Sequence, residues 1–228
     1  MRKRFVIADI HGCYKTFRYL LEEILQPGRD DQLYLLGDYI NKGPSSKKTL
    51  DYIIRLKEYL PETALLMGNH EQYLLNAQAN PASFHLFIEK GGGQTLKDFG
   101  VDSPGKISES YFAFIRTLEY YRKFDDIILV HAGLNFKATD PYLDRDAMLN
   151  IRSMGPPTPE FQSYTIIHGH VPVPLKRVLE QENRQACRDI FLDAGCVYPS
   201  RPGMGFLVAL ELNSWAFFVK ECIDEVEA

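Results

Sequence analysis

The segment Gln32-Leu33-Tyr34-Leu35-Leu36-Gly37-Asp38 decides the fold. Its short apolar run, closed by a glycine and a carboxylate, predicts a buried strand with Asp38 at its carboxyl end. In open α/β sheets, ligands bind at that edge. A Gly-Asp pair after a single strand is more often an ordinary turn, so a functional site needs support from the rest of the chain.

The same pattern, an apolar run followed by a side chain able to bind metal, recurs along the chain. The further runs lead into Asp9-Ile10-His11, Gly68-Asn69-His70, His131-Ala132-Gly133 and His168-Gly169-His170. Five of the six histidines stand in these motifs, and only His85 lies elsewhere. One histidine is more often a hydrogen-bonded structural residue than a ligand. The whole set, with Asp9, Asp38 and Asn69, predicts a metal site assembled from separate strands.

Length and composition fit one domain spanning residues 1–228. The net charge of −4 gives no basic surface for nucleic acid. No apolar run approaches the length of a membrane span, and the stretch after Met1-Arg2-Lys3-Arg4 breaks at Asp9, too early for a signal peptide. We therefore expect a cytoplasmic protein with neither a membrane nor a nucleic acid as partner. The sequence leaves the oligomeric state open.

The four cysteines show no Cys-x-x-Cys pair and no zinc-finger spacing; they are Cys13, Cys187, Cys196 and Cys222. In a cytosolic protein this pattern favours reduced thiols with a structural or incidental role. Cys13 stands beside the predicted site, which makes it a candidate for oxidation.

The order of the elements indicates an α/β first half and a β-rich second half, forming two packed sheets. A strand over Arg4–Ala8, a helix over Tyr14–Leu25 and the strand before Asp38 make a βαβ unit with parallel pairing. An aromatic-rich helix is predicted over Tyr111–Tyr121. The later strands are predicted over Arg188–Asp193, Phe206–Glu211 and Trp215–Lys220.

Two segments between these elements raise questions of function. Gly91-Gly92-Gly93 is predicted to be a flexible joint, because it neither follows a strand nor precedes the Lys-Ser/Thr of a phosphate-binding loop. Residues 135–159 are irregular and contain Arg152, and long irregular stretches tend to be functional or mobile.

Mixed oxygen and nitrogen donors suit Mn²⁺, Fe²⁺ or Zn²⁺, whereas Ca²⁺ prefers oxygen alone. Seven or eight donors are too many for one such ion but suit two ions about 3.5–4 Å apart, with Asp38 as the natural bridge. Such a pair generates a bridging hydroxide that attacks phosphorus, which indicates hydrolysis of a phosphoester. His70 is the candidate general acid, and Arg152 and Lys42 are candidate phosphate ligands.

The motifs together resemble those of the calcineurin-like metallophosphoesterases, and more narrowly the bacterial branch of the phosphoprotein phosphatases. The resemblance covers about Phe5 to Leu212. It is carried by Asp9-Ile10-His11-Gly12, Gly37-Asp38-Tyr39-Ile40-Asn41-Lys42-Gly43-Pro44, Gly68-Asn69-His70-Glu71, His131-Ala132-Gly133 and Gly169-His170, and also by Leu149-Asn150-Ile151-Arg152 and Asp193-Ala194-Gly195-Cys196.

The resemblance implies a four-layer αββα sandwich of two mixed sheets with flanking helices. It also implies two divalent metal ions, with Mn²⁺ favoured over iron or Zn²⁺. Asp9, His11 and Asp38 would hold the first ion, and Asp38, Asn69, His131 and His170 the second. Catalysis would rest on His70, Asp38 and Arg152, and substrate binding on Arg152, Lys42, Asn69 and Asn41. His168 matches no ligand position and is predicted to be structural.

Several positions depart from the family pattern. The first motif usually begins with glycine, where this chain has Ala8. The second motif usually contains Asp-Arg, where this chain has Asn41-Lys42, and an arginine near the third motif is replaced by Met67. Asn41 can accept a hydrogen bond from His70 but cannot stabilise its cation by charge, which predicts a lowered His70 pKa and weaker acid catalysis.

Three functions remain open on the sequence alone. The leading prediction is a phosphomonoesterase acting on phosphoserine or phosphothreonine in proteins, or on a small phosphoester. The second is a hydrolase of dinucleoside polyphosphates, with the aromatic helix near Tyr111 stacking on a base. The third, motivated by the departures at Asn41, Lys42 and Met67, is a weakly active phosphate-binding protein.

Overall fold

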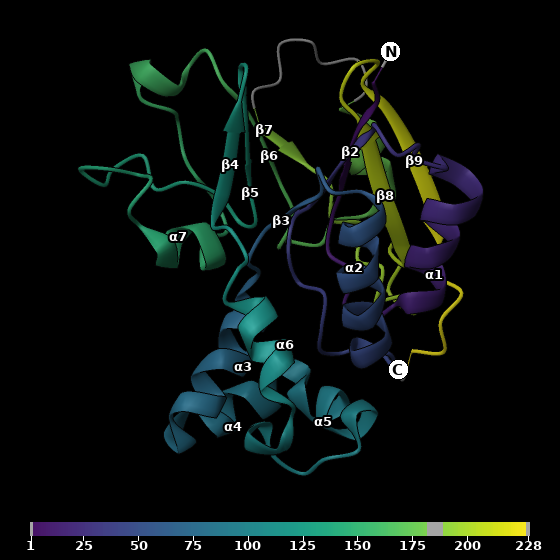
Figure 1. Ribbon diagram of the computed structural model, residues 1–228. Coiled ribbons are helices and arrows are strands. Elements are labelled where there is room, and N and C mark those ends of the chain that lie inside the picture. Colours follow the sequence, from purple (N-terminus) through teal and green to yellow (C-terminus); the bar gives the residue numbers. More distant parts are fainter. Residues whose placement is uncertain (1, 182–188, 227–228) are drawn as a thin grey trace.

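Two mixed β-sheets pack face to face in the computed structural model, which describes residues 2–181 and 189–226 (Figure 1). The first sheet has the strand order β3-β2-β1-β8-β9, and the second has β4-β5-β6-β7. The strands of the first sheet are β1 (Arg4–Ile7), β2 (Gln32–Leu35), β3 (Ala64–Leu65), β8 (Phe206–Glu211) and β9 (Ala216–Glu221). Those of the second are β4 (Tyr121–Phe124), β5 (Ile127–Val130), β6 (Thr165–His168) and β7 (Asp189–Phe191).

Successive side chains along a strand point to opposite faces of the sheet, and apolar side chains pack on both faces. In β1 and just after it, Val6 and Ala8 point into the layer between the sheets, where they join residues such as Leu129 of β5. Phe5 and Ile7 point the other way, into the core beneath the helices. Because both faces are buried, the run is apolar throughout, as expected for strands inside a layered α/β protein.

Helices cover the outer faces and one end of the sheets (Figure 1). The first sheet packs under α1 (Tyr14–Tyr19), which continues as a π-helical segment over Leu20–Leu25, and under α2 (Ser46–Tyr59). The second sheet packs against α7 (Arg145–Asn150) and the irregular chain around it, including Leu134 and Phe161.

A group of short helices lies at the lower end of the sheets in Figure 1. It consists of α3 (Asn69–Ala79), α4 (Phe84–Phe87), α5 (Gly93–Phe99) and α6 (Glu109–Ile115), with a π-helical segment at Ile88–Gly92 and 3₁₀ turns at Pro81–Ser83 and Pro104–Lys106. The remaining helical pieces are the 3₁₀ turn Pro159–Phe161 and α8 (Leu175–Leu179). In the described parts of the chain, no helix combines the length and apolar character that crossing a membrane requires.

The structure confirms the predicted α/β fold with two mixed sheets and flanking helices, including the parallel pairing of β1 with β2. The first half is α/β and the second half is β-rich, as predicted, but the two halves do not form one sheet each, because β8 returns to pair antiparallel with β1 in the first sheet. The helix predicted over Tyr111–Tyr121 ends at Ile115, and Tyr121 begins β4. This edge strand is held by its pairing with β5, a contact that a local helical pattern cannot reveal.

Candidate metal centre

The carboxyl ends of strands from both sheets bring the predicted site residues together. Asp38 lies between two groups of histidines: its Oδ2 is 3.4 Å from Nε2 of His11 and 3.8 Å from Nε2 of His70. Its Oδ1 is 3.5 Å from Nε2 of His131. Ligand atoms of Asp38, His131 and His170 lie within 4.8 Å of one another, as do those of His11, Asp38 and His70. Asp38 therefore occupies the position that a ligand shared by two ions requires.

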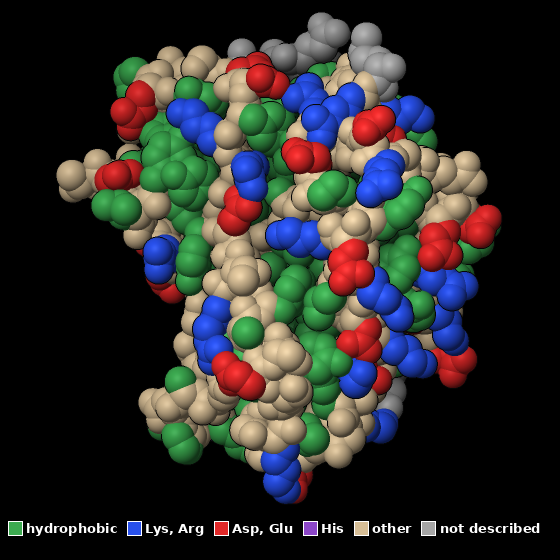
Figure 2. Space-filling model, in the orientation of Figure 1, with side chains coloured by type: hydrophobic (Ala, Val, Ile, Leu, Met, Phe, Trp, Pro, Cys, Tyr) green, Lys and Arg blue, Asp and Glu red, His purple; other side chains and the backbone are tan. Residues whose placement is uncertain are grey.

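These side chains are buried except for His170, which is half-buried, and the face shown in Figure 2 displays mixed charges and no histidine. Nδ1 of His11 lies 3.1 Å from the Ile40 carbonyl oxygen, and Nδ1 of His131 lies 2.9 Å from that of Leu36. Each carbonyl therefore accepts from an Nδ1–H, and each Nε2 keeps its lone pair toward Asp38. Burial lowers the pKa of both histidines to about 3, so both are neutral and able to bind a cation.

Asp9 and His170 complete the cluster from opposite sheets. The backbone N–H of His170 donates to the Asp9 carboxylate, 3.0 Å from Oδ2 and 3.2 Å from Oδ1. Burial, followed by the negative charges of Asp193 and Asp38, raises the pKa of Asp9 well above its ordinary value. Burial also lowers the pKa of His170 to about 3. The site thus concentrates acceptors and negative charge without an equal number of donors.

Asn69 shows most directly that a cation fits here. Its carboxamide oxygen lies 3.0 Å from His131 Nε2 and faces only acceptors, among them His170 Nδ1 and the Asp38 carboxylate. A divalent ion placed among these lone pairs would satisfy all of them, whereas the two N–H bonds of a turned amide would satisfy only some. The donor set of carboxylate, imidazole and amide oxygen fits Mn²⁺, Fe²⁺ or Zn²⁺.

The backbone at the site is held in an uncommon conformation. Five non-glycine residues have left-handed φ angles between 47° and 69°: His11, Asp38, Asn41, Lys42 and His170. This region disfavours residues with a Cβ by about 1 kcal/mol each, so it persists only where surrounding contacts enforce it.

Glu71 supplies many of those contacts and was not singled out from the sequence. Its buried carboxylate accepts four backbone N–H bonds: Oε2 from Asp38 and Gly68 at 2.9 and 3.0 Å, and Oε1 from Tyr39 and Ile40 at 2.8 and 3.2 Å. One side chain thereby fixes the loop that carries Asp38 against the loop that carries Asn69 and His70. The Gly-Asn-His-Glu motif contained this residue, but nothing local showed which N–H groups it would meet.

His70 contacts Asn41 in the sense opposite to the predicted one. Asn41 Oδ1 accepts from the Thr95 hydroxyl at 2.7 Å, and its Nδ2 lies 3.0 Å from His70 Nδ1, so Asn41 donates to the ring. The neutral ring then carries its proton on Nε2, toward Asp38. Burial lowers the pKa of His70 well below its ordinary value, with further lowering by His11 and Lys42. The direction agrees with the sequence prediction, but burial is the largest cause.

Replacing Asn41 by aspartate tests this arrangement. A carboxylate at position 41 would accept from His70 Nδ1–H and favour the imidazolium, so we expect the His70 pKa to rise and kcat near neutral pH to increase about 10-fold. The measurement is the pH profile of kcat, with Asn76→Asp on the exposed side of α3 as a control for added charge. An unchanged profile would mean that Asn41 does not limit His70.

A cavity of about 600 Å³ opens beside the cluster. Two predicted phosphate ligands, Lys42 and Arg152, line it, and Arg201, which the sequence analysis did not identify, joins them. The other lining residues are Asp38, Asn69, His70, Tyr73, Glu89, Lys90, Gly91, Asn150, His170, Pro172 and Tyr198. The Arg201 guanidinium lies 3.8 Å above the ring of Tyr198. Lys42 Nζ lies 3.0 Å from His11 Nε2, which also brings it next to the ligand cluster.

Gly91, the first residue of the Gly91-Gly92-Gly93 segment, lines this cavity. Gly91 has φ +86° and its carbonyl accepts from the Lys42 N–H at 3.2 Å. A Cβ at Gly91 would come within 2.9 Å of the Lys42 side chain. Glycine is therefore required by a close backbone approach that fixes Lys42 at the edge of the site.

Three other residues prove to lie outside the cluster. His168 Nε2 pairs with Asp189 of β7 at 2.8 Å, in agreement with the structural role predicted for it. His85 is exposed on α4. Tyr111 donates to Asp51 and packs edge-on against Phe99, and it is not among the residues that line the cavity; base stacking by its helix stays a prediction.

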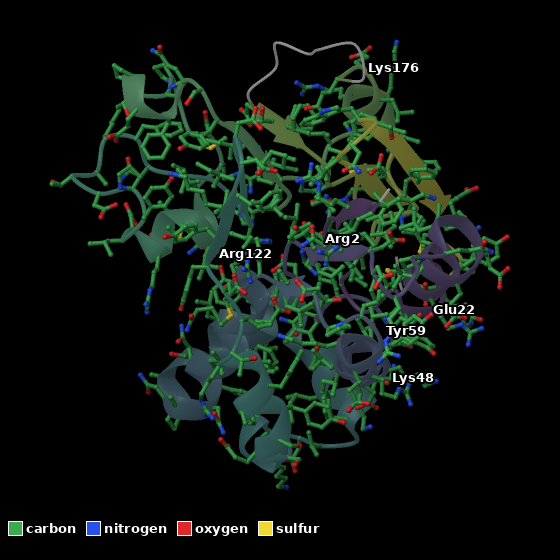
Figure 3. The ribbon with its side chains drawn as sticks, turned by 45° about the horizontal axis from the view of Figure 1, so that its top comes forward. Arg2, Glu22, Lys48, Tyr59, Arg122 and Lys176 are labelled. Carbon is green, nitrogen blue, oxygen red and sulfur yellow. The ribbon has the colours of Figure 1, made fainter. Side chains whose placement is uncertain are left out.

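A larger cavity, of about 790 Å³, lies between the α1 and α2 segments. Two of its lining residues, Glu22 and Tyr59, are labelled on the right-hand side of Figure 3. None of the predicted metal ligands lines it. Convergent donors and perturbed pKa values mark a functional site better than size does, so the smaller cavity is the candidate active site.

Known proteins resemble this chain both in sequence and in fold. A symmetrical bis(5'-nucleosyl)-tetraphosphatase of Dechloromonas aromatica is 33% identical over 130 residues, which are 57% of this chain and 43% of that relative. The chain thus aligns with less than half the length of this curated relative. A crystal structure of a candidate diadenosine tetraphosphatase superposes with a TM-score of 0.66 at 21% identity, covering 96% of this chain and 92% of the other.

A Saccharomyces cerevisiae protein serine/threonine phosphatase superposes with a TM-score of 0.64 at 15% identity, covering 99% of this chain and 82% of the other. At such low identity, both structural likenesses establish the fold alone. The family model for calcineurin-like phosphoesterases matches residues 3–198, the part of the chain that carries all the clustered side chains. The chain belongs to the calcineurin-like phosphoesterase family.

Proposed function

We propose that this chain is a metal-dependent hydrolase of dinucleoside polyphosphates. The observation that carries the proposal is the cavity in which Lys42, Arg152 and Arg201 line a space next to the Asp and His cluster. A single phosphoryl group needs one or two cationic partners. A chain of phosphates carries more negative charge, which a longer row of cationic side chains can neutralise. The activity for which the Dechloromonas aromatica relative is named supports the same substrate class.

The leading sequence prediction, a phosphoprotein phosphatase, has less support than this alternative. The serine/threonine phosphatase shares the fold at 15% identity, whereas the tetraphosphatase shares 33% of its residues over the matched segment. The fold is common to both activities, so the choice depends on the cavity and on the sequence relatives.

In the proposed reaction, two divalent cations bound by Asp9, His11, Asp38, Asn69, His131 and His170 would supply the positive charge that acidifies the attacking water and screens the phosphate. Arg152 and Lys42 would hold non-bridging phosphate oxygens, Arg152 with a planar pair of N–H donors. His70 lines the cavity and would hydrogen-bond the leaving oxygen through Nε2–H, with Asn41 fixing the ring through Nδ1.

Substrate comparison tests the proposal. With Mn²⁺ present, we expect kcat/KM for diadenosine tetraphosphate to exceed that for a phosphoserine peptide and for p-nitrophenyl phosphate by about 100-fold. Chromatography of the products is expected to show two molecules of ADP from each substrate molecule. Faster release of phosphate from the peptide would restore the phosphoprotein phosphatase, and no hydrolysis of any of the three would favour the weakly active phosphate-binding protein.

Arg201→Ala tests the role of the cavity in the same experiment. Loss of this guanidinium is expected to raise KM for diadenosine tetraphosphate about 10-fold and leave p-nitrophenyl phosphate nearly unaffected, because the shorter substrate does not extend to it. Arg18→Ala, in the cavity between the α1 and α2 segments, is the matched control and should change neither. Equal effects of Arg201→Ala on both substrates would argue against a long substrate in this cavity.

A further inference from the structure

Three cysteines that are distant in the sequence lie together in the fold. Cys13 immediately precedes α1, Cys196 follows the Asp193-Ala194-Gly195 segment, and Cys222 follows β9. Their Sγ atoms all lie within 4.8 Å of one another. Three separate segments thus deliver sulfur to one point, which none of the spacings between these cysteines in the sequence indicated.

The cluster is enclosed on most sides and approachable from one. Cys13 and Cys196 are 0% and 1% exposed, whereas Cys222 is half-buried. Outside the cluster, the thiols contact two backbone carbonyls at long range, that of His11 for Cys13 at 3.9 Å and that of Asp224 for Cys222 at 3.8 Å, and Cys222 also contacts the Thr16 side chain. A cysteine that merely fills a core packs against carbon, so apolar packing alone does not require three sulfurs to converge.

The surrounding backbone holds the cluster in place. The Asp224 carboxylate accepts the N–H of Lys15 at 3.0 Å and the N–H and hydroxyl of Thr16 at 2.9 and 2.7 Å. The N–H of Cys222 donates to the Gly205 carbonyl at 2.8 Å. The segment that carries Cys222 is therefore fastened to the start of α1, directly beside Cys13.

We propose that Cys13, Cys196 and Cys222 form a binding site for one Zn²⁺ ion, separate from the Asp and His centre. Zinc–thiolate bonds of about 2.3 Å in a tetrahedral arrangement place sulfurs about 3.8 Å apart, within reach of the observed cluster after small side-chain rotations. Binding releases the thiol protons to solvent. Three thiolates favour a soft ion such as Zn²⁺, whereas the catalytic cluster offers only oxygen and nitrogen donors, so the two sites differ in donor chemistry.

Cadmium is a direct probe of this site, because sulfur-to-metal charge-transfer absorption arises from thiolates and not from carboxylate or imidazole ligands. Titration of the metal-free protein with Cd²⁺ is expected to produce this absorption, saturating at one equivalent and reversed by excess Zn²⁺. Zn²⁺ is also expected to slow alkylation of Cys222, read by mass spectrometry. Absence of the absorption, or equal alkylation rates with and without Zn²⁺, would overturn the proposal.

Variants at the three positions make the test specific. Cys222→Ser, at the half-buried edge of the cluster, is expected to weaken Cd²⁺ binding about 100-fold or more while leaving the circular dichroism spectrum unchanged. Cys196→Ala should have the same effect on binding. Cys187→Ser, whose position lies outside the described residues, is the control and should keep the absorption. Absorption that survives Cys222→Ser, or a disulfide found within the trio in protein purified without reductant, would contradict a zinc site.

Discussion

The Asp38→Asn variant is expected to lose at least about 1,000-fold in kcat for diadenosine tetraphosphate at saturating Mn²⁺. Asp38 is the carboxylate that both histidine groups surround, so the change removes a ligand that two ions would share. Loss of one preorganised electrostatic partner from an active site lowers kcat by about 100- to 1,000-fold, and a shared ligand affects more than one such partner. We also expect the bound manganese, measured by elemental analysis, to fall below one ion per chain.

The same variant should not unfold the protein. The negative charge of Asp38 contributes to raising the pKa of buried Asp9, so neutralising it relieves repulsion between like charges. The melting temperature of the metal-free variant is therefore expected to equal or exceed that of the unchanged protein. The matched control is Asp189→Asn. Asp189 lies on β7 and its carboxylate pairs with His168 of β6, so this variant should keep both metal and activity. Near-normal activity in Asp38→Asn would remove the basis for a two-ion centre.

The Glu71→Gln variant is expected to be less stable by about 3 kcal/mol. Each carboxylate oxygen accepts two backbone N–H bonds, so whichever way a glutamine turns, its NH₂ group faces two donors. Two hydrogen bonds from backbone N–H groups are lost, at about 1.5 kcal/mol each. Denaturant unfolding of the metal-free protein measures the difference in free energy.

We expect Glu71→Gln to lower activity as well, because the freed loop no longer holds the left-handed backbone of Asp38. Glu62→Gln is the control: Glu62 is exposed and pairs with Arg2 at 3.6 Å, and its loss should change stability by less than about 0.5 kcal/mol. If Glu71→Gln unfolds at the same denaturant concentration as the unchanged protein, other contacts fix the loop.

Strand-end motifs can be predicted from the sequence because they combine two local signals, an apolar run and the polar residue that ends it. Parallel strands of one sheet expose their carboxyl ends at one edge, so Asp38 and Asn69 could be expected to meet. His131 and His170 follow strands of the second sheet, and they meet Asp38 and Asn69 only because the carboxyl ends of strands in both sheets lie on the same side of the molecule. The resemblance to a known family supplied that step. The structure then placed all of these side chains in one cluster.

Contacts between distant segments could not be read in the same way. Arg201 reaches the site from a position with no distinctive spacing, most partners of Glu71 lie on a separate loop, and the orientation of Asn41 depends on Thr95, 54 residues away. The close approach of Gly91 to Lys42 was not predicted either, because the two residues are far apart in the sequence. The assignment of β8 and β9 to the first sheet was equally hidden, because an edge for pairing is defined only after the sheet has formed.

By itself the sequence determined the local elements and the kind of chemistry: which runs are buried, where each one ends, and that oxygen and nitrogen donors accumulate at those ends. Only the tertiary structure decided the reach of the cavity, the hydrogen-bond partner that holds each loop, and the meeting of Cys13 with Cys196 and Cys222. The physical reason is that periodicity and turn residues act over a few positions, whereas a site is a set of short distances between segments that hydrophobic packing brings together.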